Sequence, residues 1–201
     1  MIVKFIFDRI VSLLGLLFFS PILLIIAILV KLESPKQPAI YRQQRIGRNG
    51  KSFTMYKFRT MVANHGGSPI SVRGESRITP LGAKLRRLKL DELPELWNVL
   101  IGDMSFVGPR PDVPGYADKL QGDDRKILSL RPGITGLATL KYRNEEELLA
   151  KVENPVLYND TVIFPDKIRI NLAYLAHYSF FLDMKILWYT FIGKDLDNFY
   201  K

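Results

Sequence analysis

Hydrophobic residues are concentrated in one uninterrupted run near the N-terminus of this 201-residue chain. Residues 10–30 carry no charge over 21 positions, and a helix of that length rises about 31 Å, enough to cross a hydrocarbon core. Pro21 lies near the middle of the run, where it removes a helical hydrogen bond. Ser20 can hydrogen-bond back to its own helix. The pattern therefore predicts a membrane helix with a bend at Ser20-Pro21.

The path of this helix is open to three interpretations. Lys4 and Arg9 precede the run, and Lys31, Lys36 and Arg42 follow it, so the positive-inside rule gives no preferred direction. A re-entrant helix, which enters the membrane, breaks at the proline and returns, explains both the charges and the break. A plain single-span helix and a secretory signal peptide are the alternatives, although no small-residue cleavage site follows the run.

After the apolar run the pattern changes to short elements separated by turn residues. Residues 39–45 and 51–58 read as two strands joined at Asn49-Gly50, a strong hairpin signal. The Gly- and Ser-rich segment 65–76 predicts a polar connection. Thr79 and Pro80 are typical of the N-cap and first turn of a helix, which should run to about Leu88.

The rest of the chain predicts mainly helices. Leucine and tryptophan recur at helical spacing after Asp91, which predicts a helix beginning there. Residues 145–152 predict a helix whose glutamates form a solvated face, and residues 168–177 and 179–192 predict two more. The last is rich in aromatic residues and suits the membrane interface or the domain core equally. The predicted fold class is α/β, mostly α: a re-entrant membrane helix (residues 1–33) and a compact helical domain (residues 34–201) with a small β-hairpin and interfacial helices.

Positive charge is placed unevenly along the chain. The net charge is +9, and residues 36–89 contain 13 lysines and arginines but one acid, Glu75. A basic block directly after an apolar anchor fits anionic lipid headgroups or a polyanionic substrate. No zinc-finger spacing or aromatic RNA-binding signature accompanies the charge, which argues against nucleic acid as a partner. The absence of cysteine excludes disulfides and cysteine-zinc sites and fits a reducing, cytoplasmic location.

Two adjacent carboxylates, Asp91 and Glu92, are the first candidates for chemistry. Asp91 is placed to cap the helix predicted after it, where the helix dipole favours its anion and also attracts phosphate. An ionised carboxylate beside a phosphate-binding element is what nucleophilic catalysis requires. Glu92 is suited to bind Mg²⁺ together with phosphate oxygens. A simple helix cap followed by a surface glutamate is the alternative for this dipeptide taken alone.

An arginine between two prolines, Arg110, is the second candidate. Its neighbours have a fixed backbone, which lowers the cost of holding the guanidinium for bidentate phosphate contact. A turn with an exposed arginine is the alternative. No nucleophile elbow, Walker A or G-x-G-x-x-G pattern occurs, which argues against a hydrolase triad, a P-loop and a Rossmann dinucleotide site. His65 and His177 lack the partner spacing of a metal site. Further candidates for phosphate binding are the basic residues Lys57, Arg59, Arg86, Arg87 and Arg131.

In their order along the chain, these segments resemble the bacterial sugar transferase family, the monotopic phosphoglycosyl transferases that start glycan assembly on a polyprenol phosphate carrier. The resemblance extends from about Lys4 to Lys194. It rests on Phe7-Asp8, Ser20-Pro21, Tyr56-Lys57-Phe58-Arg59-Thr60-Met61, Leu90-Asp91-Glu92-Leu93-Pro94, Gly102-Asp103-Met104-Ser105, Gly108-Pro109-Arg110-Pro111, Arg131-Pro132-Gly133-Ile134-Thr135-Gly136 and Leu182-Asp183-Met184-Lys185.

The resemblance implies a re-entrant helix, catalysis on the cytoplasmic face of the bacterial inner membrane, and a Mg²⁺-dependent reaction in two steps. Asp91 would attack the sugar-bearing phosphate of a UDP-sugar and release UMP, and undecaprenyl phosphate would then attack the phosphosugar-enzyme. Glu92 would complete the dyad and help Asp91 hold Mg²⁺, while Arg110 would grip phosphate, as would Lys57, Arg59 and Arg131. The reaction would be the first membrane step of capsule, exopolysaccharide, O-antigen or glycoprotein assembly. Anionic membrane lipids are expected partners, and the family pattern leaves open whether the protein forms a homo-oligomer.

The chain departs from the family pattern at three places. Many relatives carry Lys-Arg before the apolar run, where this chain has Lys4-Phe5, and the residue two before the catalytic aspartate is often Ser but is Lys89 here. The usual Gln-Val-x-Gly-Arg is replaced by residues 139–143, so the sugar is not transferable from relatives. Two rival functions remain: a membrane glycosyltransferase that releases UDP, and a non-catalytic membrane scaffold on the same fold. The intact Asp91, Glu92 and Arg110 argue against the scaffold.

Overall fold

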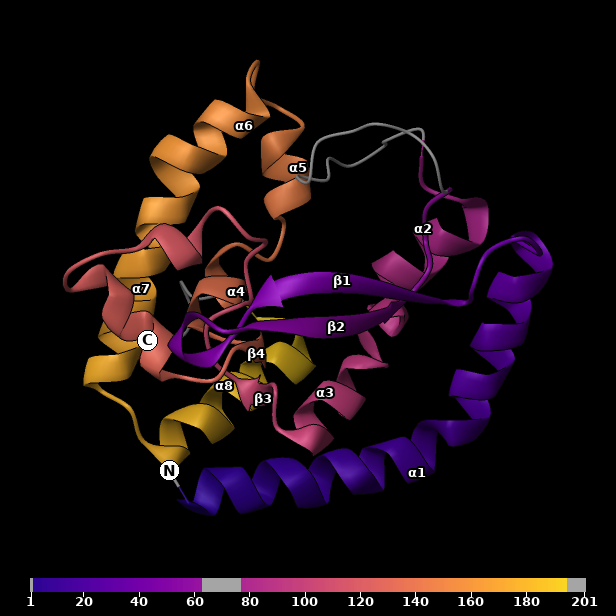
Figure 1. Ribbon diagram of the computed structural model, residues 1–201, viewed down its shortest axis with the longest axis horizontal. Helices are drawn as coiled ribbons and strands as arrows, with labels where there is room; N and C mark the ends of the chain where they lie inside the picture. Colours follow the sequence, from indigo (N-terminus) through magenta and orange to yellow (C-terminus); the bar gives the residue numbers. More distant parts are fainter. Residues whose placement is uncertain (1, 63–76, 195–201) are drawn as a thin grey trace.

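A long bent helix forms one edge of the molecule. The computed structural model describes residues 2–62 and 77–194, so the predicted connection at 65–76, with His65, lies outside the described residues. Helix α1 (Ile2–Glu33) runs beneath the domain and then turns sharply (Figure 1). Pro21 lies inside it, and the Ser20 hydroxyl donates to the Leu17 carbonyl over 2.8 Å. The bend and the back-bonding serine agree with the sequence prediction.

Most of the apolar surface of α1 faces away from the protein. The described part of the chain contains one helix long and apolar enough to cross a membrane, and only 11% of its most apolar 18-residue window is buried. Leu17 is 64% exposed and Phe18 is 76% exposed. The core helix of a soluble domain would instead bury such residues, because exposed apolar patches of this length are rare in water.

Both arms of α1 nevertheless pack on the same domain. In the first arm Asp8 and Ser12 are buried, and the Asp8 carboxylate accepts from the Phe106 backbone N–H over 3.3 Å. In the second arm Ile26 and Val30 are buried in a cluster formed with strand β2 (Ser52–Phe58) and helix α2 (Pro80–Arg87). The helix therefore leaves the domain surface and returns to it within 32 residues.

The predicted hairpin is confirmed. Strands β1 (Ile40–Ile46) and β2 (Ser52–Phe58) pair antiparallel, with Ile40 opposite Phe58 and Ile46 opposite Ser52. Asn49 and Gly50 in the turn have φ values of 60° and 77°. Only glycine and short polar residues adopt this left-handed conformation readily, which is why the Asn-Gly pair predicts the turn.

Helix α2 is confirmed, whereas the segment around Asp91 folds differently from the prediction. Helix α2 (Pro80–Arg87) begins at Thr79, whose hydroxyl accepts from the Gly82 backbone N–H over 3.0 Å. Asp91 lies inside a 3₁₀ turn, η2 (Leu90–Glu92), and helix α3 (Glu95–Ile101) begins after Pro94. The predicted helix start and cap at Asp91 are wrong, because Asp91 already lies inside a 3₁₀ turn, whereas an N-cap residue has a non-helical backbone.

Two family motifs meet in a second small sheet. Strand β3 (Ser105–Val107) pairs parallel with β4 (Gly133–Thr135). A Cβ on Gly133 would lie 2.1 Å from the backbone nitrogen of Gly108, so the two backbones can approach this closely only because both residues are glycine. This contact sets the direction in which the chain continues toward Arg110.

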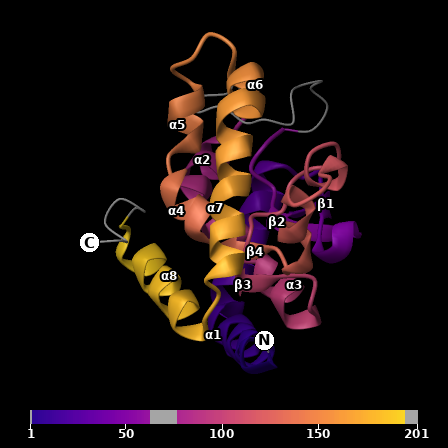
Figure 2. The same cartoon turned by 90° about the vertical axis from the view of Figure 1, so that its left-hand side faces the viewer.

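The C-terminal half is helical, as predicted. Figure 2 shows α7 crossing the middle of the domain, with α8 beside the start of α1. The predicted helix at 145–152 ends early at Leu149, and the one at 168–177 begins earlier, at Phe164. The remaining elements are the 3₁₀ turns η3 (Ala117–Lys119) and η4 (Asp124–Ser129), the helices α4 (Leu137–Lys141), α5 (Glu145–Leu149) and α6 (Pro155–Tyr158), the π turn η5 (Asn159–Ile163), α7 (Phe164–Ala176) and α8 (Phe180–Ile192).

Helix α8 divides its two faces between the core and the surface. Ile186 is fully buried in the main cluster with Val107, Leu140 and Tyr174, whereas Phe191 is 84% exposed. The core alternative is therefore confirmed for one face of α8, and the place of its exposed face at the membrane interface stays a prediction.

Candidate active site

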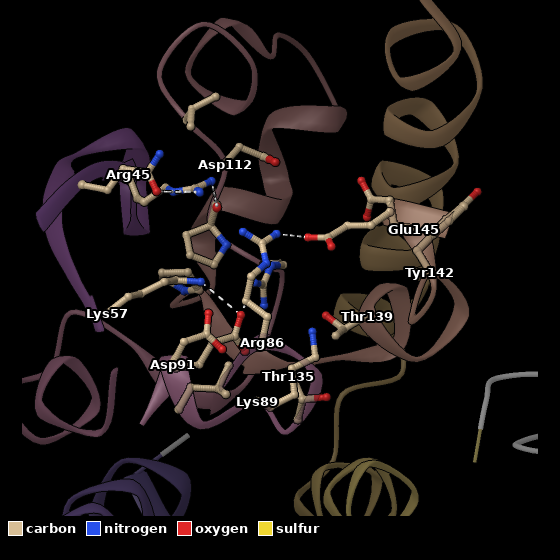
Figure 3. Close-up of a pocket in the computed structure, with 18 of the residues that line it drawn as sticks. Arg45, Lys57, Arg86, Lys89, Asp91, Asp112, Thr135, Thr139, Tyr142 and Glu145 are labelled. Atoms are coloured by element: carbon tan, nitrogen blue, oxygen red, sulfur yellow. Dashed lines mark hydrogen bonds and ion pairs between the residues drawn. The ribbon is translucent and has the colours of Figure 1, made fainter. Parts of the chain in front are cut away.

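A cavity of about 1760 Å³ lies between the hairpin, the α2–η2 segment, the loop after β3 and helices α4, α5 and α7. Figure 3 shows charged side chains entering it from several of these elements. Seven residues predicted as candidates line this one cavity: Asp91, Glu92, Arg110, Lys57, Arg59, Arg86 and Arg87.

The carboxyl group of Asp91 is nearly enclosed. The residue is 8% exposed, and its Oδ1 is buried without a hydrogen-bond partner among residues 2–62 and 77–194. Burial, followed by the negative charge of Glu92, raises the pKa of Asp91 above its ordinary value, against the opposing charges of Lys57 and Arg86. The sequence prediction that a helix dipole favours the Asp91 anion is therefore wrong, because Asp91 caps no helix here.

Glu92 is shifted in the opposite direction. Lys57 Nζ donates to Glu92 Oε1 over 3.0 Å, and Arg110 pairs with the same oxygen. Burial on its own raises the pKa of Glu92, but Arg110 and Lys57 together hold that pKa well below the ordinary range. Two adjacent carboxyl groups thus have opposite pKa shifts, an arrangement that suits different roles for the two.

A third carboxyl group, Glu95, lies beneath this pair. It is 1% exposed, and Lys57 Nζ lies 3.0 Å from its Oε1, although only the contact with Glu92 has hydrogen-bond geometry. Burial raises the pKa of Glu95, and the charge of Lys57 opposes this. Sequence reasoning missed Glu95. The available signal was its spacing, since residues 92 and 95 lie on the same side of a helical turn.

The far wall of the cavity is formed by the glutamate run that was predicted to be solvated. Glu146 instead pairs with Arg86, and Glu145 accepts from Lys167 Nζ over 2.6 Å. The prediction of a solvated face is wrong, because α5 packs across the cavity opposite α2 and its glutamates meet cations from other elements. Arg59 lies at the rim, where its Nε donates to the Pro38 carbonyl over 3.0 Å.

Arg131 is not brought to this cavity. Its Nε donates to the Gly102 carbonyl over 3.0 Å, and its guanidinium lies 5.0 Å from the centre of the Phe5 ring. It therefore packs beside α1, and the cavity lining does not include it. Its predicted role toward substrate phosphate has no support from this position. His177 contacts the Ala173 carbonyl through Nδ1 over 2.9 Å, a helix-end contact of a structural kind.

The sequence of the chain matches a known protein family over almost its whole length. The model of a family described as bacterial sugar transferase matches residues 1–194. The chain belongs to the bacterial sugar transferase family.

Three relatives of this sugar transferase have informative names. It is 37% identical to the UDP-glucose:undecaprenyl-phosphate glucose-1-phosphate transferase of Klebsiella pneumoniae, covering 96% of this chain and 41% of that protein. It is 35% identical to the exopolysaccharide production protein PSS of Rhizobium leguminosarum bv. phaseoli, covering 96% of both. It is also 35% identical to the UDP-N-acetylgalactosamine-undecaprenyl-phosphate N-acetylgalactosaminephosphotransferase of Aeromonas hydrophila, covering 91% of this chain and 41% of that protein. The chain thus matches the full length of one relative and well under half of the other two.

The donor set of the sugar transferase limits which metal it can hold. Among the described residues, no group of three or more His, Asp or Glu side chains converges as a metal site, and the chain has no cysteine. The candidate metal ligands are therefore Asp91, whose Oδ1 has no hydrogen-bond partner among these residues, and Glu92, whose lowered pKa favours the carboxylate. Two carboxylates fit a hard cation that takes its other ligands from phosphate oxygens and water, which is the usual environment of Mg²⁺.

A second, half-buried cluster of charged groups in the sugar transferase also escaped sequence reasoning. Burial raises the pKa of Asp112 to about 6, while Lys167 and Arg45 oppose the shift. Arg45 in turn donates to the Pro111 carbonyl over 3.0 Å. Strand pattern and loop composition give no signal for either residue, because their burial depends on elements more than 50 positions away in the chain.

Proposed function

We propose that this sugar transferase moves a sugar-1-phosphate from a UDP-sugar to undecaprenyl phosphate and releases UMP. The names of its relatives support the reaction class. The observation that carries the proposal is the pair Asp91 and Glu92, whose opposite pKa shifts occur in a cavity lined by Lys57, Arg86 and Arg110. Cations around a buried carboxyl group suit the binding and displacement of phosphate.

In the first step a carboxylate oxygen of Asp91 attacks the phosphorus that carries the sugar. A new bond forms between phosphorus and Asp91, the bond from phosphorus to the UMP oxygen breaks, and its electron pair leaves with UMP. Arg110 and Lys57 stand on the Glu92 side of the attacking group, where they are placed to hold phosphate oxygens. Glu92 remains ionised and keeps both cations in position.

In the second step an oxygen of undecaprenyl phosphate attacks the same phosphorus. The bond from phosphorus to Asp91 breaks, and the carboxylate is regenerated. Each step exchanges one phosphorus–oxygen bond for another, so no oxidant or reductant is needed. Donor and acceptor use one cavity in turn, and we therefore expect double-displacement kinetics.

Mg²⁺ is part of the proposal, with Asp91 and Glu92 as the residues that would hold it. When bound, the ion supplies positive charge that offsets the phosphate oxygens and favours the Asp91 anion. UMP release should stop in EDTA and return when Mg²⁺ is added. Glu92→Gln should need more Mg²⁺ for the same recovery. Turnover that continues unchanged in EDTA would contradict this part of the proposal.

We further propose that α1 is re-entrant and that the domain lies on the cytoplasmic face of the inner membrane. Support comes from the bend at Ser20-Pro21, from the exposed apolar surface, and from the packing of both arms on one domain. A straight helix spanning the bilayer would separate its ends by the full membrane thickness, so both could not contact the same domain.

A covalent intermediate tests the proposed reaction most directly. Incubation with a UDP-sugar and Mg²⁺, without lipid acceptor, should add one phosphosugar mass to the peptide that contains Asp91. Asp91→Asn should lose the adduct, because an amide is a poor nucleophile toward phosphorus. Asp124→Asn, an exposed change outside the cavity, should keep it. An adduct that persists in Asp91→Asn, or release of UDP in place of UMP, would refute the mechanism.

A further inference from the structure

Lys89 has an unusual backbone conformation at the edge of the active-site cavity. Its φ of 57° and ψ of 20° are left-handed. Among the described residues, the other residue besides glycine with positive φ is Asn49, in the hairpin turn. Asparagine and glycine adopt this conformation at little cost, whereas lysine does so at a penalty because of its Cβ. Lysine is strained in a backbone conformation that asparagine would adopt more easily, which indicates that the lysine side chain has a function here.

Lys89 lies where its side chain can contact a molecule bound in the cavity. Lys89 lines the same cavity as Asp91 and Glu92, and Figure 3 shows it on the wall that carries Asp91. Its positive charge acts on both carboxyl groups and favours their ionised forms. The ammonium group is therefore close enough to influence the reacting centre.

Within the described part of the chain, Lys89 differs from the neighbouring cations because its ammonium group has no partner. Lys57 is shared by Glu92 and Glu95, Arg86 pairs with Glu146, and Arg110 pairs with Glu92. For the Lys89 ammonium, residues 2–62 and 77–194 provide no hydrogen bond and no ion pair. A cation that already pairs with a carboxylate has fewer hydrogen-bond donors left for a substrate, whereas an unpaired ammonium group can use all three of its donors for an anion.

We propose that Lys89 is a phosphate-binding residue of the sugar transferase, holding a phosphate of the substrate against the Asp91–Glu92 pair. The inference rests on the proposed function for the identity of the substrate. Two phosphates enter this cavity in that scheme, those of the nucleotide donor and that of the lipid acceptor, and both present the same oxyanion chemistry.

Equilibrium binding separates this role from the chemistry. UDP and pyrophosphate are titrated into the purified enzyme in detergent, and Lys89→Asn is compared with the wild type. Asparagine removes the charge and tolerates the left-handed backbone. We expect the UDP dissociation constant to rise about tenfold, as for the loss of one partly exposed charge-assisted hydrogen bond. Lys89→Arg should recover most of the affinity. Lys119→Asn, an exposed lysine outside the cavity, should bind like the wild type.

Thermal unfolding distinguishes binding from a structural role. Lys89→Asn and Lys89→Gly should be as stable as the wild type or more so, because both relieve the backbone strain. A residue with only a structural role would lose stability and affinity together. Equal UDP and pyrophosphate affinity in Lys89→Asn and wild type, with equal KM for undecaprenyl phosphate, would overturn the inference.

The two sources of phosphate give different results in the same set of variants. Weaker UDP binding and slower formation of the phosphosugar-enzyme assign Lys89 to the donor. Unchanged UDP binding with a raised KM for undecaprenyl phosphate in vesicles assigns it to the lipid. A wild type that binds UDP but releases no UMP from UDP-sugars contradicts the proposed function and leaves the Lys89 comparison valid. A wild type that binds neither UDP nor pyrophosphate contradicts both.

Discussion

Replacing Asp183 with alanine removes the carboxylate through which α8 holds the start of α1. Lys4 Nζ lies 2.6 Å from Asp183 Oδ2 and also donates to the Val107 carbonyl over 2.7 Å. Tyr174 OH donates to the other Asp183 oxygen over 2.5 Å. The change would leave the Lys4 ammonium and the Tyr174 hydroxyl without their shared acceptor.

The burial of both groups sets the expected magnitude. Asp183 is 1% exposed, and the Lys4 side chain is 13% exposed. Removing one partner of a buried ion pair costs about 3–5 kcal/mol, because the other charge stays buried and uncompensated. For a chain of this length each 1 kcal/mol lowers the melting temperature by about 2–4 °C, so a fall of roughly 6–20 °C is expected.

Thermal unfolding of the purified enzyme, followed by tryptophan fluorescence at a fixed detergent concentration, measures the effect. A double-mutant cycle with Lys4→Met isolates the pair, because removing both charges together leaves neither one uncompensated. We expect the two single changes to sum to about 1–3 kcal/mol more than the double change. Asp124→Ala, which removes an exposed carboxylate, should stay within about 0.5 kcal/mol of the wild type.

Strict additivity in this cycle would refute the reasoning. It would mean that Lys4 and Asp183 contribute to stability independently and that the ion pair does not attach α1 to α8. A melting temperature of Asp183→Ala that matches Asp124→Ala would refute the estimate of burial as well.

Three further predictions follow from the glycine contact, the pKa of Asp91 and the path of α1. Gly133→Ala should abolish folding or activity, because the added Cβ would lie 2.1 Å from the Gly108 nitrogen. Gly122→Ala, whose Cβ would meet open space, should lower the free energy of unfolding by only about 1 kcal/mol in chemical denaturation. Folding raises the pKa of Asp91, so the ionised carboxylate destabilises the folded protein at a pH above that pKa. Asp91→Asn should therefore melt at a higher temperature than the wild type in EDTA at neutral pH, and the two melting temperatures should converge as the pH falls toward 3.8. A lower melting temperature for Asp91→Asn at neutral pH would show that burial does not disfavour the anion. Single cysteines at positions 2 and 36 should both resist an impermeant maleimide in intact cells and react after permeabilisation, and labelling at position 2 alone would identify a spanning helix.

Local signals in the sequence predicted the features that depend on neighbouring residues. The hairpin turn at Asn49-Gly50 and the helix start at Thr79 follow from backbone preferences of a few adjacent positions, and both are present. The bend in α1 follows from Pro21 in the same way. The order of the motifs along the chain was enough to predict the family, since it requires no knowledge of distance in space.

Features that depend on distant residues were decided only by the tertiary structure. Glu95 becomes part of the site because the ammonium group of Lys57, from the hairpin, lies 3.0 Å from its carboxylate. Arg131 lies outside the site because its guanidinium binds the Gly102 carbonyl and packs against the Phe5 ring of α1. The spacing of residues 92 and 95 is a local signal for Glu95, but the burial and charge pairing of Glu95 and Arg131 are properties of the packed chain and not of any short segment.

Asp91 shows most clearly where sequence reasoning stops. The motif identified the residue, and helix capping then predicted an easily ionised carboxylate. In the folded chain no helix begins at Asp91, and burial beside Glu92 raises its pKa instead. A motif in the sequence can single out a candidate group, but the ionisation of that group depends on solvent exclusion and on charges from other elements, which exist only once the chain has folded.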